Sequence, residues 1–273
     1  MRNILKLKKT TIVIIAVFLL FSLYSSKSFG FDWDSFLEGL YRCNITFQRP
    51  IYGDTYLYND PLNTSFTVID VFGDDYTFYI NQNANSSKIS YLSLNIRIPF
   101  FYTDSLSIGF SNSQRYFYTN IFNETGFSTD SILMANGGGL YLNLKATNQL
   151  CIFTVLGAVY YEIDSVADTL RPSWYGDPGL YWNGYFYEPG TPLKVKGQTD
   201  YMFFFSVGIK YYLLSGLYLE LCYSNFPGAT IKNMSYILEG PTDLKINVSS
   251  DKMPKPITIK ESSIITFGIG LGL

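Results

Sequence analysis

The chain has 273 residues, of which 47% are hydrophobic, 18% aromatic and only 15% charged, and this composition excludes disordered and coiled-coil proteins. The first thirty residues hold five basic side chains and no acidic one, so the remainder carries 15 basic and 22 acidic residues, a net charge of −7. Such a chain lacks the clustered basic face that neutralises phosphates, which excludes DNA and RNA as expected partners. The sequence has no histidine, the commonest general base and metal ligand, so we expect no catalytic site, no metal site and no cofactor.

The chain opens with the pattern of an export signal. Residues 2–9 are basic, Ile12–Leu23 is almost wholly apolar, and the stretch up to Gly30 is short and polar. These are the three regions of a secretory signal peptide, and Ser28 and Gly30 are small residues at the positions that a signal peptidase reads. The apolar run is shorter than the about 20 residues that span a bilayer. We therefore predict a cleaved signal peptide over 1–30.

Residues 31–273 are dominated by an alternation of apolar and polar side chains, which is typical of β-strands with one apolar face. Leu92 and Leu94, for example, are followed by Ser93 and Asn95 on the other face. The alternation predicts eight strands: Leu37–Phe47, Lys88–Phe101, Ser105–Tyr118, Ile132–Ala146, Leu150–Ile163, Asp200–Leu213, Leu217–Phe226 and Ile257–Leu273.

The connections between these strands are alternately tight and long. The tight ones are Thr103–Ser105, Thr147–Gln149 and Leu214–Gly216. Short turns at one end and long loops at the other are typical of an outer-membrane barrel, whereas a soluble sandwich has shorter strands. We therefore predict an all-β fold, a closed antiparallel up-and-down transmembrane β-barrel of eight strands, which forms one domain over 31–273 with long extracellular loops.

The first long connection contains the pattern of a further hairpin. Phe66–Phe72 and Tyr76–Ile80 are strand-like and flank the turn residues Gly73 and Asp74. We place this hairpin beyond the membrane, as an extension of the loop. A barrel of ten strands is the alternative.

The spanning sheet is expected to turn its apolar face outward. Lipid offers no hydrogen bonds, so the sheet must close, and its polar face must line the lumen. Small residues on the polar face, such as Gly208, Gly268 and Gly270, suit a crowded interior. Asn112 and Gln114 are polar at outward positions, so either a bulge shifts the register there or the strand has left the lipid. Bulky residues on the inward face favour a plugged interior over an open channel: Tyr91, Tyr141, Phe153, Phe204 and Tyr218.

The signal segment, the eight alternating strands and the terminal sequence Ser263–Leu273 together resemble the small bacterial outer-membrane barrels of the OmpA-like and OmpX-like type. The resemblance covers essentially the whole mature chain and is one of pattern. In that family the last strand is read by the barrel-assembly machinery and usually ends in an aromatic residue, whereas this one ends in Leu273, with Phe267 as the nearest aromatic. The resemblance implies a location in the bacterial outer membrane, with outer-membrane lipid and the barrel-assembly machinery as partners.

Charged residues on the inward face predict a network in the lumen. The tight turn at 214–216 sets Lys210 directly opposite Glu220. A charge that points into a narrow interior must be paired or hydrated. We therefore expect two carboxylates shared among four cations, with separately hydrated charges as the alternative, and the residues concerned are Lys210, Glu220, Glu38, Arg42, Arg97 and Lys145.

The connection over 164–199 is rich in aromatic residues and prolines. Exposed aromatic side chains stiffened by prolines provide contact area at a low entropic cost. One interpretation is an outward-facing recognition loop for a surface ligand or a host protein. The other is that the aromatic rings pack on each other over the barrel mouth. The aromatic residues are Trp174, Tyr175, Tyr181, Trp182, Tyr185, Phe186 and Tyr187.

The sequence therefore predicts an integral outer-membrane barrel protein with a non-enzymatic role in surface recognition or anchoring. A small-solute channel is the first alternative, and a soluble periplasmic barrel that binds an apolar ligand is the second. An enzyme is disfavoured because outer-membrane proteases and acyl hydrolases generally rely on histidine, which this chain lacks.

Overall fold

The computed structural model describes residues 42–124, 127–128, 131–171, 179–214, 216–261 and 263–272. The predicted signal peptide lies outside this part of the chain. Within the described residues, no helix is long and apolar enough to cross a bilayer. Apart from one turn of 3₁₀ helix, η1 (Ser250–Lys252), the regular elements described are strands, so the predicted all-β class is confirmed.

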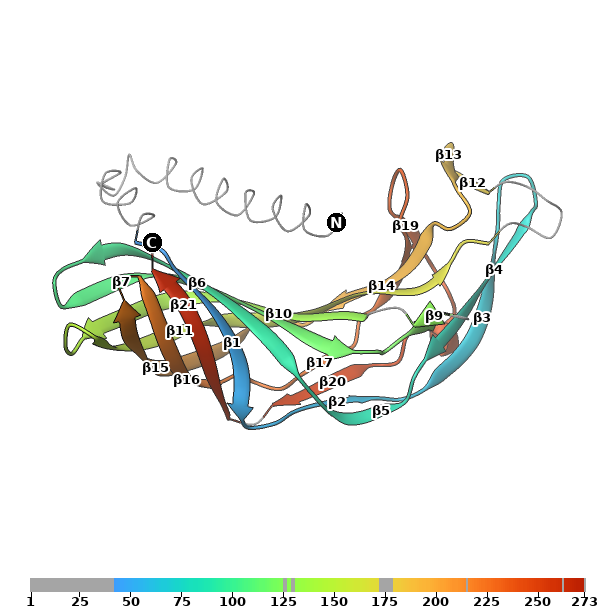
Figure 1. The fold of residues 1–273 in the computed structure, drawn as a ribbon. Coiled ribbons are helices and arrows are strands. Elements are labelled where there is room, and N and C mark those ends of the chain that lie inside the picture. The colour runs from blue at the N-terminus through green and yellow to red at the C-terminus, as the bar shows by residue number, and fades with distance from the viewer. Residues whose placement is uncertain are drawn as a thin grey trace.

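Eight antiparallel strands form a closed ring. Its order is β10-β7-β6-β1-β21-β16-β15-β11, and the pairing of β10 with β11 closes it. The predicted closed eight-stranded barrel is therefore confirmed, with its tight turns gathered at one end, the left end in Figure 1. The strands are β1 (Asn44–Tyr52), β6 (Tyr91–Tyr102), β7 (Leu106–Thr119), β10 (Ser131–Lys145), β11 (Leu150–Thr169), β15 (Met202–Leu214), β16 (Leu217–Asn225) and β21 (Ile264–Gly272).

The predicted extra hairpin exists but does not join the ring. It forms β3 (Leu62–Ile69) and β4 (Asp75–Gln82), which pair with each other as a separate two-stranded sheet. The ten-stranded alternative is therefore wrong. The hairpin lies at the end of the molecule opposite the tight turns (Figure 1).

The long connections fold into a body that we call the extension. Two of the predicted strands, Lys88–Phe101 and Ile257–Leu273, are each divided by a short break. One segment of each strand belongs to the barrel, and the other segment belongs to the extension. One part is a four-stranded sheet in the order β17-β20-β2-β5, and another continues from β11 through β14 and β18 to β19. The strands of the extension, besides β3 and β4, are β2 (Thr55–Asn59), β5 (Asn85–Ile89), β8 (Asn123–Glu124), β9 (Phe127–Ser128), β12 (Leu180–Trp182), β13 (Tyr185–Tyr187), β14 (Pro192–Gln198), β17 (Ala229–Ile231), β18 (Ser235–Leu238), β19 (Leu244–Ile246) and β20 (Ile257–Glu261).

The barrel wall has the inverted polarity that the alternation predicts. Val207 and Ile269 are 42% and 53% exposed on the outer face, while the polar residues between such positions are buried inside. On β11 the outward face is apolar, apart from one threonine, from Leu150 to Tyr160. With a rise of about 3.3 Å per residue and a tilt of about 40°, this run is about 25 Å tall, the height of a lipid-facing belt.

Above this belt the polarity reverses. On β7 the outward positions change from Phe110 to Asn112 and Gln114, while the inward positions change from Ser113 to the buried Phe117. The pairing of β7 with β10 runs without a register shift through this region, so the bulge considered for Asn112 is absent. The outward polar residues instead mark where the strand passes from the apolar belt into the extension, whose interior is an apolar core.

Candidate functional site

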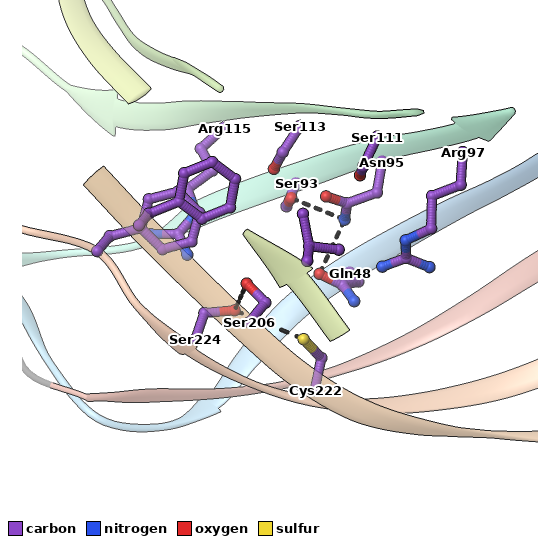
Figure 2. Close-up of a pocket in the computed structure, with 13 residues that line it drawn as sticks. Gln48, Ser93, Asn95, Arg97, Ser111, Ser113, Arg115, Ser206, Cys222 and Ser224 are labelled. Atoms are coloured by element: carbon purple, nitrogen blue, oxygen red, sulfur yellow. Dashed lines mark hydrogen bonds between the residues drawn. The ribbon is translucent and has the colours of Figure 1, made fainter. Parts of the chain in front are cut away.

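A small polar chamber lies in the middle of the barrel (Figure 2). Its free space holds about one water molecule, since the surrounding side chains fill the rest of the lumen. The hydroxyls of Ser206 and Ser224 are 2.9 Å apart, and the amide of Asn95 donates to Gln48 at 2.8 Å. These residues occupy inward positions on four barrel strands, where the alternation predicts polar side chains. The other serines of the wall are Ser93, Ser111 and Ser113.

An ion pair lies on the turn side of the chamber. Arg97 donates from both terminal nitrogens to the Glu220 carboxylate, at 2.5 and 2.8 Å. Gln48 donates to the same carboxylate at 2.5 Å. The two charged side chains are 2% and 0% exposed, so this pair is isolated from water. Charge-assisted, two-point bonds of this kind are strong and fix the geometry of both partners.

Lys210 is part of the same layer but has a different partner. It pairs with Glu220 in the strand register, as the turn predicts. Its ammonium group nevertheless donates to the Tyr141 hydroxyl at 2.8 Å, and no ion pair among the described residues joins it to Glu220. Three aromatic rings surround it at 4.9 to 5.5 Å, and they belong to Tyr141, Phe153 and Tyr218. The bulky inward residues therefore close the lumen as a packed plug.

A second buried ion pair lies on the opposite side of the chamber, towards the extension. Arg115 donates to both oxygens of Glu261, at 2.9 and 3.1 Å, and its guanidinium group lies 3.3 Å from the centre of the Phe226 ring. The alternation along the strands does not predict this pair. Arg115 occupies an inward position in the alternation of β7, so its place in the lumen could have been predicted from the sequence. Glu261 lies at the break between β20 and β21, and the alternation does not reveal this break.

The remaining predicted lumen cations lie elsewhere. Arg42 and Lys145 line an open vestibule at the turn end, and both are exposed. Arg42 stacks on the ring of Tyr102 at 3.9 Å. No ion pair among the described residues joins either of them to Glu220, because they lie several residues nearer the turns, and their predicted sharing with Glu38 stays a prediction. Glu38 lies outside the described residues.

The predicted recognition residues divide into buried and exposed ones. Tyr187 is buried and donates to the Thr242 carbonyl at 3.0 Å, and Trp182 packs against the core of the extension. Tyr181 and Tyr185 are 39% and 44% exposed. Among the described residues, some aromatic side chains are therefore packed inside the extension and others are exposed as a recognition loop requires. Trp174 and Tyr175 lie outside the described residues.

The exposed aromatic residues meet the turn of the β3–β4 hairpin. The Phe72 ring, 73% exposed, makes an edge contact with Tyr181 at 5.4 Å, and Tyr181 contacts Phe186 at 4.6 Å. The backbone N–H of Val71 donates to the Tyr181 carbonyl at 3.4 Å. The sequence predicts this hairpin but does not connect its turn with the recognition loop, because the contact between such distant residues exists only in the fold. We call this surface the aromatic tip: Ile69, Val71, Phe72, Tyr181, Tyr185 and Phe186.

One lysine bridges strands of the extension. Lys194 on β14 lies 2.9 Å from Glu239 and 3.2 Å from Asp164 of β11. Burial acts to lower the pKa of Lys194, but the hydrogen bond to Glu239 and the charges of both carboxylates outweigh it and raise this pKa above its ordinary value. The protonated lysine therefore helps to hold the extension on the barrel strand.

The closed ring, the packed polar lumen and the apolar outer belt define an eight-stranded antiparallel β-barrel of inverted polarity. No family model and no curated protein matches the sequence. Similar solved structures include Ail, the attachment invasion locus protein of Yersinia pestis, with 8% identity over 84% of this chain and 95% of that chain and a TM-score of 0.35. They also include Neisserial surface protein A, with 9% identity over 85% of this chain and 97% of that chain and a TM-score of 0.33. The outer membrane protease OmpT of Escherichia coli has 9% identity over 85% of this chain and 96% of that chain, with a TM-score of 0.33.

Proposed function

We propose that this chain is an integral protein of the bacterial outer membrane whose role is non-enzymatic recognition or anchoring through the aromatic tip. The observation that carries the proposal is a contrast between the two ends of the fold. The lumen is packed shut, whereas on the extension the exposed rings of Phe72 and Tyr181 contact each other, and Tyr181 also contacts Phe186. Such exposed patches mark interaction sites on folded proteins.

The outer belt supports membrane insertion. Large apolar residues are exposed on all sides of the ring, and a water-soluble protein rarely exposes so much contiguous apolar surface. The predicted export signal would deliver the chain to the envelope, and β21 would present the terminal strand to the barrel-assembly machinery. Examples of the exposed residues are Phe47, Leu140, Leu156, Phe203, Ile209 and Leu271.

A channel is the weaker alternative. A solute crossing the barrel would have to displace the Arg97–Glu220 pair and the rings around Lys210, all of which are buried. The free space of the chamber holds about one water molecule. The same small, polar chamber offers no room for the apolar ligand of a soluble periplasmic barrel.

The buried carboxylates support a non-enzymatic role. Glu220 and Glu261 each accept two hydrogen bonds from an arginine, which holds them as structural anions. A general acid or base must instead reach a substrate proton. The chain has no histidine to take that part.

The proposal is tested on bacterial cells that display the protein. Envelope fractionation and heat-modifiable gel migration would first establish insertion of each variant. The double variant Phe72→Ser/Tyr181→Ser removes the centre of the aromatic tip, and we expect it to lower adhesion to surface ligands or host cells by at least about tenfold. The control is Tyr79→Ser, which removes a comparably exposed aromatic residue on β4 outside the tip. Equal adhesion by the double variant and the wild type would refute the proposal.

A further inference from the structure

Two strands of the extension have a free edge beside one groove. Among the described strands, β3 pairs only with β4, and β19 pairs only with β18. A strand with one neighbour leaves every second backbone N–H and C=O on its other side without a partner strand. Residues 66–69 of β3 and 244–246 of β19 both line the same groove, so two backbone edges are available there.

Apolar and polar residues both line the groove. Its volume is about 520 Å³, which is within the size range of ligand pockets and leaves room for a short peptide segment. On β3 the residues Phe66 and Val68 alternate with Thr67 and Ile69, so the side chains of a neighbouring strand would meet an apolar surface at every second position. The other apolar residues of the groove are Trp182, Leu244, Ile246 and Val248.

The charge of the groove has one sign. Lys245 and Lys252 line it, and no aspartate or glutamate does. The neighbouring Asp251, outside the lining, has a carboxyl pKa that is lowered by its hydrogen bond to Ser249 and by the charges of Lys252 and Lys255, so its carboxylate offsets part of the charge of Lys252. Neither lysine forms an ion pair among the described residues, in contrast to Lys196, which is paired with Asp243. The groove therefore complements a ligand with negative charge.

We propose that this groove binds an extended acidic segment of a partner protein, which pairs its backbone with β3, β19 or both. This inference rests on the proposed recognition function and names the class of partner. Main-chain hydrogen bonds to the free edges would give affinity, and apolar side chains at alternate positions would fit the groove. At about 3.3 Å per residue, the four lining residues of β3 match a segment of about four residues.

The test uses a short fluorescent peptide that alternates valine with glutamate. The purified full chain in detergent should bind it, as measured by fluorescence anisotropy, and should not bind a peptide that alternates valine with lysine. Successive backbone N–H groups of a strand point to opposite edges. N-methylation of all valine amides, or of all glutamate amides, therefore removes donors on one edge at a time. At least one of the two methylated peptides should lose binding.

The role of charge is tested on the protein. We expect Lys245→Glu/Lys252→Glu to weaken binding by at least about tenfold at low salt, and the difference to shrink at high salt. The matched control is Lys232→Glu, which makes the same change at an exposed residue of the extension outside the groove. Heat-modifiable migration would verify that each variant is folded.

The outcomes separate this inference from the proposed function. Absence of peptide binding, or equal binding of both methylated peptides and the parent peptide, would overturn the groove inference. If that happens while Phe72→Ser/Tyr181→Ser still abolishes adhesion, the recognition function stands without the groove. If the tip variant adheres normally, the proposed function fails whatever the peptide does.

Discussion

The buried Arg97–Glu220 pair makes the sharpest prediction about the barrel. The substitution Arg97→Met removes the guanidinium group but keeps a side chain of similar length. Glu220, 1% exposed, would then keep only the hydrogen bonds from Gln48 and Thr46. Two bonds to charged groups at about 1.5–3 kcal/mol each give a loss of about 3–6 kcal/mol. The range of about 3–5 kcal/mol for one broken partner of a buried pair agrees with this value.

The double variant Arg97→Met/Glu220→Leu separates the cost of an orphaned charge from the value of the pair. Since it removes both charges of the pair together, we expect it to be within about 1–2 kcal/mol of the wild type. The assay is urea unfolding in lipid vesicles, followed by heat-modifiable gel migration. The control is Lys196→Met, which breaks an ion pair whose partners are 34% and 55% exposed and should cost less than about 1 kcal/mol. An Arg97→Met loss as small as that of Lys196→Met would refute the reasoning.

Three further predictions concern the lumen, the wall and the extension. Purified protein in planar bilayers should give no large, steady single-channel steps, and such steps would contradict the packed lumen. Gly270→Ala should destabilise the barrel by about 1–3 kcal/mol, because the new methyl group would overlap the Tyr218 ring, whereas Gly138→Ala, with its nearest neighbouring atom at 3.7 Å, should be tolerated in the same urea assay. Because the pKa of Lys194 is raised in the folded state, its contribution to stability is present below the ordinary lysine pKa and is lost as the pH rises through the raised value. The protection of β14 amides against hydrogen exchange, relative to their intrinsic exchange rates at each pH, should therefore fall at alkaline pH in the wild type, and Lys194→Met should lack this fall.

The barrel could be predicted from the sequence because its strands and their pairing are determined by residues close together in the chain. A period of two residues fixes which side chains share a face, and a tight turn fixes the register of its two strands. Both rules hold for Lys210 and Glu220, which pair as the turn at 214–216 predicts. Parity also placed Arg97 inside, where it is buried.

The partner choices inside the lumen could not be predicted in the same way. Parity does not tell which charged groups meet across the ring, because that depends on the tilt and stagger of strands far apart in the sequence. Glu220 therefore binds Arg97 of β6 instead of the directly paired Lys210, whose ammonium group is held by Tyr141. The pairing of Arg115 with Glu261 has the same origin.

The extension was underestimated for a related reason. Its strands are short, and several pair only with segments far away in the chain, such as β2 with β20 and β14 with β11. Such segments look like loops until the barrel brings them together. The aromatic tip is the clearest case, because Phe72 and Tyr181 belong to different connections.

The continuity of β11 from the wall into the extension bears on how a partner would be held. From Tyr160 to Thr169 the strand advances by about 30 Å without leaving the sheet. If the barrel is inserted in the outer membrane as we propose, a molecule bound at the far end of the extension would be held at a fixed distance from the barrel wall, and a force on it would be transmitted along β11 to that wall. Because the strands of the extension that pair with β11 are already hydrogen-bonded into the sheet, binding a partner there would cost little conformational entropy.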